Sequence, residues 1–130
     1  MLFARVLLVI QLLALAGLGL AYFVRPHEMA NLSGMLLMAP AAVTDVRAYY
    51  GGLQLGLAAF IGLSLLRLDL IRAALTLLVL VYSALALARI GGLWLDGGAQ
   101  QTFNLYALLL EVVSAGLCYW ALRGLQRLSA

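Results

Sequence analysis

Four long apolar segments, separated by short polar connections, constrain this sequence more than any other feature. They cover residues 6–24, 45–66, 71–91 and 103–122, and each is close to the roughly 20 residues that a helix needs to cross a bilayer. Hydrophobic residues make up 66% of the 130-residue chain and charged residues only 10%, against about 25% charged residues in a soluble domain. A soluble fold of this length cannot bury so much apolar surface. The sequence therefore predicts an all-α, integral membrane four-helix bundle that forms a single domain over residues 1–130.

The connections between the segments predict how the helices follow one another. Residues 25–44 contain both prolines, and Pro26 suits the first turn of a short helix. The leucines and methionines around it give this connector an apolar side, so we expect a short helix along the membrane interface. We expect the third helix to break at the glycine pair 91–92 and an exposed loop to continue through Asp-Gly-Gly at 96–98. The short links between the last three spans predict antiparallel neighbours.

The arginines predict the orientation of the chain in the membrane. All eight basic residues are arginine, and the net charge is +3. The arginines expected beside the two termini and the turn between the second and third spans are Arg5, Arg67, Arg72, Arg123 and Arg127. The charges on the opposite side nearly cancel. Because positively charged loops stay on the cytoplasmic side, we expect both termini to be cytoplasmic.

Four charged side chains lie within the apolar segments, although a charge at the bilayer centre costs about 3 kcal/mol. Counting 1.5 Å per residue places all four in the outer half of the bundle. Seven-residue spacings put further polar residues on the same helical faces, and in a left-handed bundle such faces meet. We therefore predict one outward-opening polar pocket. Its candidate residues, here called the predicted polar cluster, are Asp45, Arg47, Tyr50, Gln54, Tyr82, Arg89, Asn104 and Glu111.

The predicted polar cluster has three interpretations. Its two acids and two arginines balance in charge, as in a structural ion cluster that fixes which helices pair and in what register. Alternatively, Glu111 is a ligand-binding or proton-carrying carboxylate partnered by Arg89 or Arg47, since ionisable residues inside membranes are functional candidates. In the third interpretation, Glu111 faces a partner subunit. The sequence leaves all three open.

Other patterns are weaker. Ala48, Gly52 and Gly56 recur every four residues, a spacing that permits close helix approach within the chain or in a dimer. His27 is the only histidine and has no nucleophile or second ligand beside it, so we expect no catalytic residue and no metal site. We expect Cys118, the only cysteine, to be a packing residue, and we expect no cofactor. The chain has no basic run, so nucleic acid is not an expected partner.

The second span opens with Asp-Val-Arg-Ala-Tyr-Tyr-Gly-Gly-Leu-Gln-Leu-Gly at residues 45–56. This run resembles the motif of an uncharacterised bacterial four-helix membrane family, domain-of-unknown-function family 4345, which is similar to the DoxX-like membrane proteins. The resemblance covers nearly the whole chain, and Arg89 and Glu111 stand where the family pattern places an arginine and a glutamate. It implies the four-helix fold, a bacterial inner membrane and a role for Arg47, Arg89 and Glu111. It implies no reaction, and the thiol chemistry associated with some DoxX-like relatives needs a cysteine pair that this chain lacks.

These features favour a small, non-catalytic inner-membrane protein. We expect its polar pocket to bind an apolar or lipid-like ligand, or the protein to assist a membrane complex. The expected partners are the lipid bilayer, such a ligand, further copies of the chain, or a protein of a membrane complex. The first alternative is a small proton-linked transporter that acts as an oligomer, with Glu111 as the proton carrier. A quinone-linked oxidoreductase ranks last, because the chain has no metal, thiol-pair or nucleotide motif.

Overall fold

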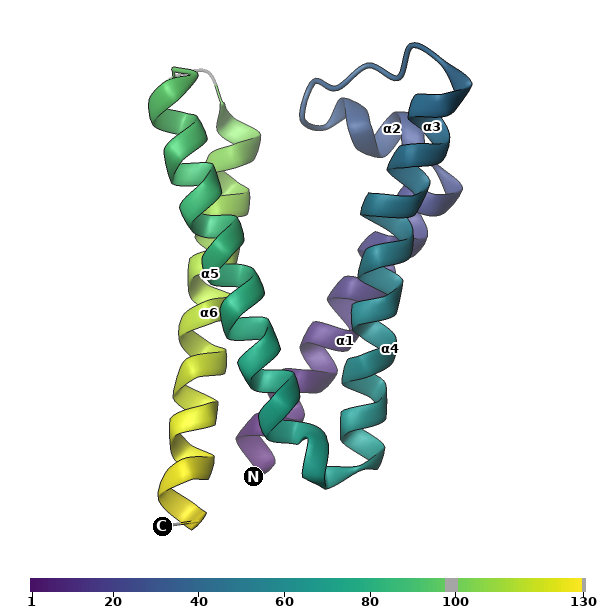
Figure 1. Cartoon of the computed structure of the whole chain (residues 1–130). Helices are drawn as coiled ribbons and strands as arrows, with labels where there is room; N and C mark the ends of the chain where they lie inside the picture. Colours follow the sequence, from purple (N-terminus) through teal and green to yellow (C-terminus); the bar gives the residue numbers. More distant parts are fainter. Residues whose placement is uncertain (98–100, 130) are drawn as a thin grey trace. The chain divides into compact units, whose positions relative to one another are not determined.

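The computed structural model describes residues 1–97 and 101–129, and its regular structure over these residues is entirely helical (Figure 1). The described part of the chain contains four helical runs long and apolar enough to cross a membrane, Leu2–Val24, Pro40–Leu66, Leu68–Leu95 and Thr102–Arg127. Each run contains one of the predicted apolar segments and extends beyond it. The all-α prediction is confirmed, and the chain is a multi-pass membrane protein.

The chain divides into two compact units. The first, here called the hairpin unit, consists of residues 1–7 and 69–130. Its main elements are helices α5 (Ile71–Leu95) and α6 (Thr102–Ser129), and a short 3-10 turn, η2 (Leu68–Leu70), leads into α5. The two helices lie side by side and antiparallel, as their short link predicts (Figure 1).

Two contacts tie the start of α5 and the chain's first residues to the last turns of α6. The Arg72 guanidinium donates to the Leu125 carbonyl at 3.2 Å. The rings of Phe3 and Trp120 lie 5.6 Å apart. Cys118, one turn before these contacts, is completely buried. At the end of α6, a polar contact and ring packing therefore both help to hold the hairpin unit together.

Helix α5 continues through Gly91 and Gly92, where the sequence predicted a break, and this prediction is wrong. The helix ends at Leu95, the Asp96 N–H bonds to the Gly92 carbonyl at 2.8 Å, and a positive φ of 78° falls on Gly97. Glycine in this left-handed conformation is a common helix end. Inside a bilayer a broken helix leaves backbone groups that no water can satisfy. The glycine pair therefore stays helical, and the helix stops where positive φ is required.

The second unit, residues 8–68, holds the rest of α1 (Leu2–Val24) and is here called the connector unit. The elements that follow α1 are α2 (Pro26–Asn31), α3 (Pro40–Val46), the π-helix η1 (Arg47–Gly52) and α4 (Leu53–Leu66). Proline stands in the first turn of both α2 and α3, where its missing N–H is not needed. The predicted short helix between the first two spans is present. The second helical run begins at Pro40, five residues before the predicted start at Asp45.

The contact between α1 and η1 depends on two glycines. A Cβ added to Gly19 would lie 2.9 Å from the Gly51 carbonyl oxygen and 2.9 Å from Leu55 Cγ. A Cβ added to Gly51 would lie 3.1 Å from the Gly19 carbonyl oxygen. Real Cβ atoms hardly ever come this close to other atoms. The two helices therefore touch backbone to backbone at this point.

The small-residue stripe predicted from the sequence does not form this contact. Nothing lies within 4 Å of a Cβ built on Gly56, and the nearest atom to one on Gly52 is the Arg47 carbonyl oxygen of the same helix. The π-helix is the reason. The Leu53 N–H bonds to the Ala48 carbonyl, five residues earlier, so the turn holds about one extra residue. It rotates everything after it by about 100° relative to a straight α-helix.

Candidate functional sites

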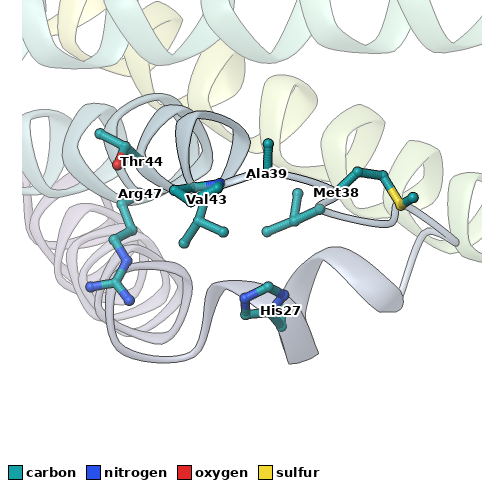
Figure 2. Close-up of a pocket in the computed structure, with 8 residues that line it drawn as sticks. His27, Met38, Ala39, Val43, Thr44 and Arg47 are labelled. Atoms are coloured by element: carbon teal, nitrogen blue, oxygen red, sulfur yellow. The ribbon is translucent and has the colours of Figure 1, made fainter.

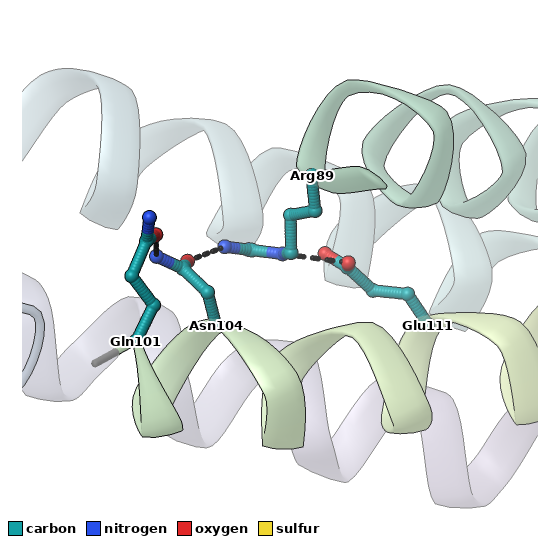
Figure 3. A network of polar contacts seen from close by, with 4 residues as sticks. All are labelled: Arg89, Gln101, Asn104 and Glu111. Carbon is teal, nitrogen blue, oxygen red and sulfur yellow. Dashed lines mark hydrogen bonds and ion pairs between the residues drawn. The ribbon is translucent and has the colours of Figure 1, made fainter. Parts of the chain in front are cut away.

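A chain of polar contacts joins α5 to α6 in the hairpin unit (Figure 3). Arg89 Nε donates to Glu111 Oε1 at 2.7 Å, and Arg89 Nη1 donates to Asn104 Oδ1 at 2.7 Å. Asn104 Nδ2 donates in turn to Gln101 Oε1 at 2.7 Å. Gln101 Nε2 donates to the Gly97 carbonyl at 3.1 Å, at the end of α5. The four side chains Arg89, Gln101, Asn104 and Glu111 are called the hairpin network below.

The Arg89–Glu111 ion pair is the centre of the hairpin network. The Glu111 side chain is 7% exposed and the Arg89 side chain 28% exposed. A single ionised group in apolar surroundings costs several kcal/mol, and pairing with additional hydrogen bonds offsets much of that cost. Among the described residues, no buried side-chain nitrogen or oxygen lacks a hydrogen-bond partner. The network is therefore neutral and satisfied, as expected of a contact that fixes α5 against α6.

Helical spacing accounts for the hairpin network. Asn104 and Glu111 are seven residues apart on α6, and Gln101 precedes Asn104 by three, so the three side chains follow one stripe. On α5, Tyr82 lies seven residues before Arg89, and its hydroxyl group is hydrogen-bonded to the side chain of Ser114 on α6. The stripes predicted on these two helices therefore face each other. Gln101 was not among the predicted residues, although its three-residue spacing from Asn104 was a usable signal.

In the connector unit, three residues of the predicted polar cluster interact locally. Tyr50 stacks on Tyr22 of α1, with ring centroids 5.1 Å apart. Gln54 Nε2 donates to the Tyr50 carbonyl at 2.7 Å, so its amide is used within its own helix. The Arg47 guanidinium lies over the Phe23 ring, 5.7 Å from its centroid. Tyr22 and Phe23, at the end of α1, thus contact Tyr50 and Arg47. The sequence had predicted that these two cluster residues would face other polar groups.

Asp45 and Arg47 do not pair with each other. Residues two apart on a helix point to different faces, and Asp45 is exposed. In the described part of the connector unit, neither side chain forms an ion pair. Of the two arginines considered as partners for Glu111, Arg89 is the one that contacts it. Arg47 has an aromatic ring as its neighbour in place of a carboxylate.

A pocket of about 490 Å³ opens on the connector unit beside Arg47 (Figure 2). Helix α2, the segment before α3, and the first turns of the second helical run all contribute to its wall. Its lining residues are His27, Leu37, Met38, Ala39, Pro40, Val43, Thr44 and Arg47. Most of these side chains are apolar, and Arg47 is the only one of them with a permanent charge. This site is called the connector pocket below.

Of the predicted polar cluster, Arg47 alone lines the connector pocket. Sequence reasoning missed the pocket because its walls come from two short helices and the segment between them, which have no common periodicity. The one sequence feature that pointed to an apolar site here is the apolar character of residues 25–44. The described residues contain no group of three or more His, Cys, Asp and Glu side chains that could hold a metal ion.

Residues 3–122 match the model of a protein family described as Domain of unknown function (DUF4345). The chain belongs to this family. The matched range includes the hairpin network and the connector pocket, and it confirms the family resemblance carried by the motif at residues 45–56. No curated protein and no solved structure matches the chain. A function for this DUF4345 member therefore has to be argued from the two sites.

Proposed function

We propose that this DUF4345 protein is a non-catalytic binding protein of the membrane whose ligand is lipid-like. The observation that carries the proposal is the connector pocket, an open site whose wall combines apolar side chains with polar groups and a single guanidinium at one side. Ligand sites are commonly built this way, from apolar walls and a few placed polar groups. A molecule with an apolar body and a polar end matches both parts of the wall.

Apolar side chains continue beyond the connector pocket along the same segment. Leu32 is 58% exposed and Leu36 70% exposed, and Met38 in the pocket wall is 86% exposed. Keeping such surface in water costs about 25 cal/mol per Å². At a membrane interface, acyl chains cover it instead. This supports a position of the connector against lipid and a pocket that lipid can enter directly.

The hairpin network supports the assignment of ligand binding to the connector. Its charges neutralise each other, and its hydrogen bonds run from one helix to the other. A ligand at this site would have to replace contacts that are already short. We therefore assign the Arg89–Glu111 pair the role of fixing the α5–α6 hairpin.

The proposal includes a location. We place the protein in the bacterial inner membrane, with both termini cytoplasmic and the connector pocket on the outer side. The support is the distribution of arginines, which favours cytoplasmic termini by the positive-inside rule. The DoxX-like resemblance of the sequence agrees with a small multi-pass protein of this membrane.

The test compares the lipids that remain on the protein after gentle extraction, measured by native mass spectrometry. We expect wild-type protein to retain a defined lipid-like adduct. The double variant Leu37→Gln/Met38→Gln makes the pocket wall polar and should reduce that adduct about tenfold, which corresponds to losing the contact of about one fully buried apolar side chain.

The matched control is Leu32→Gln/Leu36→Gln, which changes two exposed leucines of the same segment that do not line the pocket. It should retain the adduct at the wild-type level. Equal loss in both double variants would mean general attachment of lipid to the connector and would overturn the pocket assignment. A wild-type protein without any adduct in several lipid mixtures would overturn the proposed function itself.

A further inference from the structure

We propose that the connector pocket selects lipids with a net negative headgroup and that Arg47 binds the headgroup phosphate. This inference rests on the proposed function, because it names the chemical class of the ligand at the same pocket. It also assigns a specific role to the arginine of the Arg-Ala-Tyr-Tyr-Gly-Gly run, which the family description leaves without one.

The first support is that, among the described residues of its unit, Arg47 has no counter-ion. Arg25 pairs with Glu28 at 3.2 Å, and Arg89 pairs with Glu111 at 2.7 Å. Arg47 is half-buried, and its one recorded interaction within the described chain is the contact with Phe23. A guanidinium held beside apolar side chains attracts an anion, and the described residues of the connector unit supply none to Arg47.

The second support is that the local backbone holds Arg47 in place. Arg47 is the first residue of the π-helix η1, and π turns inside α-helices occur frequently at functional sites. The backbone contact of Gly19 with Gly51 fixes η1 against α1. The Arg47 guanidinium also lies over the Phe23 ring, with its central carbon 5.7 Å from the ring centroid. The planar fork of a guanidinium can bind two phosphate oxygens together, and among the described residues Arg47 forms no hydrogen bond or ion pair that would use its N–H groups.

The third support is the composition of the rest of the pocket. His27 comes from α2 and Arg47 from η1, so two helices bring nitrogen-bearing side chains to one site (Figure 2). An imidazole has at least one N–H donor in either protonation state. Leu37, Met38 and Val43 supply the apolar part of the wall. A free phosphate ion would leave that wall unused, whereas a phospholipid covers it with acyl chain while its phosphate meets Arg47.

The net charge of the headgroup determines which class of phospholipid Arg47 binds better. A zwitterionic headgroup carries its own cation, which competes with Arg47 for the phosphate. An anionic headgroup has no such cation and neutralises the guanidinium. One basic side chain at a membrane surface favours anionic lipid by about 1 kcal/mol, which is about fivefold in affinity.

The experiment measures lipid adducts by native mass spectrometry after mixing the purified protein with phosphatidylglycerol and phosphatidylcholine of identical acyl chains. Wild type should bind phosphatidylglycerol about fivefold better. Arg47→Gln should lose this preference while still binding both lipids through the apolar wall. Arg47→Lys, which keeps the charge and loses the two-pronged donor geometry, should keep part of it.

The matched control is Arg25→Gln, which removes an equal charge from the same unit at an arginine that is already paired with Glu28 and does not line the pocket. It should keep the wild-type preference. If Arg47→Gln keeps the preference, or if Arg25→Gln loses it equally, the assignment to Arg47 is overturned. Circular dichroism of each variant checks folding, and the partial retention expected of Arg47→Lys provides a second reading should Arg47→Gln fail to fold.

Two further outcomes separate this inference from the proposed function. Binding of both lipids to wild type at equal strength would overturn the headgroup selection and leave lipid binding itself intact. Binding of neither lipid would overturn both. Addition of millimolar inorganic phosphate tests the source of the anion. Loss of the phosphatidylglycerol preference in free phosphate would mean a site for soluble anions and would overturn the lipid assignment.

Discussion

Two arginines inside apolar helices, Arg89 in the hairpin unit and Arg47 in the connector unit, have opposite surroundings. Arg89 pairs with the buried carboxylate of Glu111, and a short series of hydrogen bonds continues from it to the end of α5. Arg47 lies over an aromatic ring at the edge of an open pocket. The same residue type thus has its charge used within the protein in one unit and left available in the other.

The comparison separates two ways of holding helices together. In the hairpin unit, a polar network joins α5 to α6. In the connector unit, α1 and η1 meet through glycine backbones and packed side chains, and no described residue of α1 forms an ion pair with one of η1. Because steric contact holds the second pair of helices, its arginine does not have to contribute to the packing. This difference is what the predictions below test.

The largest effect should come from Glu111→Gln. The substitution leaves the Arg89 charge without a counter-ion, and we expect a loss of about 2–3 kcal/mol in the free energy of unfolding, measured by denaturant titration in micelles. Removing one partner of a fully buried pair costs about 3–5 kcal/mol, and the 28% exposure of Arg89 reduces this.

The double variant Arg89→Gln/Glu111→Gln is the control for that prediction. It removes both charges, so most of the lost stability should return. An unchanged free energy of unfolding in Glu111→Gln would mean that the Arg89–Glu111 pair has no structural role. The contrast drawn between Arg89 and Arg47 would then be wrong. Proton flux into liposomes that is present in wild type and absent in Glu111→Gln would instead support the transporter hypothesis.

An intermediate effect should come from Gly19→Ala in the connector unit. The added Cβ would lie 2.9 Å from the Gly51 carbonyl oxygen, so α1 and η1 must separate. Overpacking of this kind costs about 1–3 kcal/mol, measured by the same titration. Gly17→Ala is the matched control on the same helix, since nothing lies within 4 Å of its Cβ. Equal effects of the two substitutions would contradict the proposed steric contact.

The smallest effect on stability should come from Arg47→Gln. It removes one cation–π contact, which is worth about 0.5–1 kcal/mol at a partly exposed site, so we expect a loss below about 1 kcal/mol. The same variant should show the loss of anionic lipid preference described above. If its destabilisation equals that of Glu111→Gln, then Arg47 has a structural charge role and the distinction between the two units fails.

Part of the candidate site could be predicted from helical spacing. Tyr82, Arg89, Asn104 and Glu111 lie on uninterrupted α-helices, where a seven-residue separation returns a side chain to the same face. The structure joins Arg89, Asn104 and Glu111 by hydrogen bonds and joins Tyr82 to α6 at Ser114. The helices are joined by a short link, so their facing stripes had to meet. Here local periodicity was sufficient.

The connector unit shows where that reasoning fails. Arg47 and Gln54 are also seven residues apart, but η1 lies between them and shifts the helical phase. Gly51 faces α1 in place of the predicted Gly52 and Gly56. Glycine spacing alone cannot reveal a π turn, because the same letters fit an ordinary α-helix. The contact with Gly19, more than thirty residues earlier in the sequence, is what shows which glycine is used.

The sequence by itself determined that this chain is helical and crosses a membrane, because apolar length and backbone hydrogen bonding leave a bilayer-spanning segment no other local choice. It also determined which faces of α5 and α6 carry polar side chains. Only the tertiary structure decided which arginine is neutralised and which is left beside a pocket. Which arginine is neutralised depends on contacts between residues far apart in the chain, and the spacing of neighbouring residues in the sequence does not reveal such contacts.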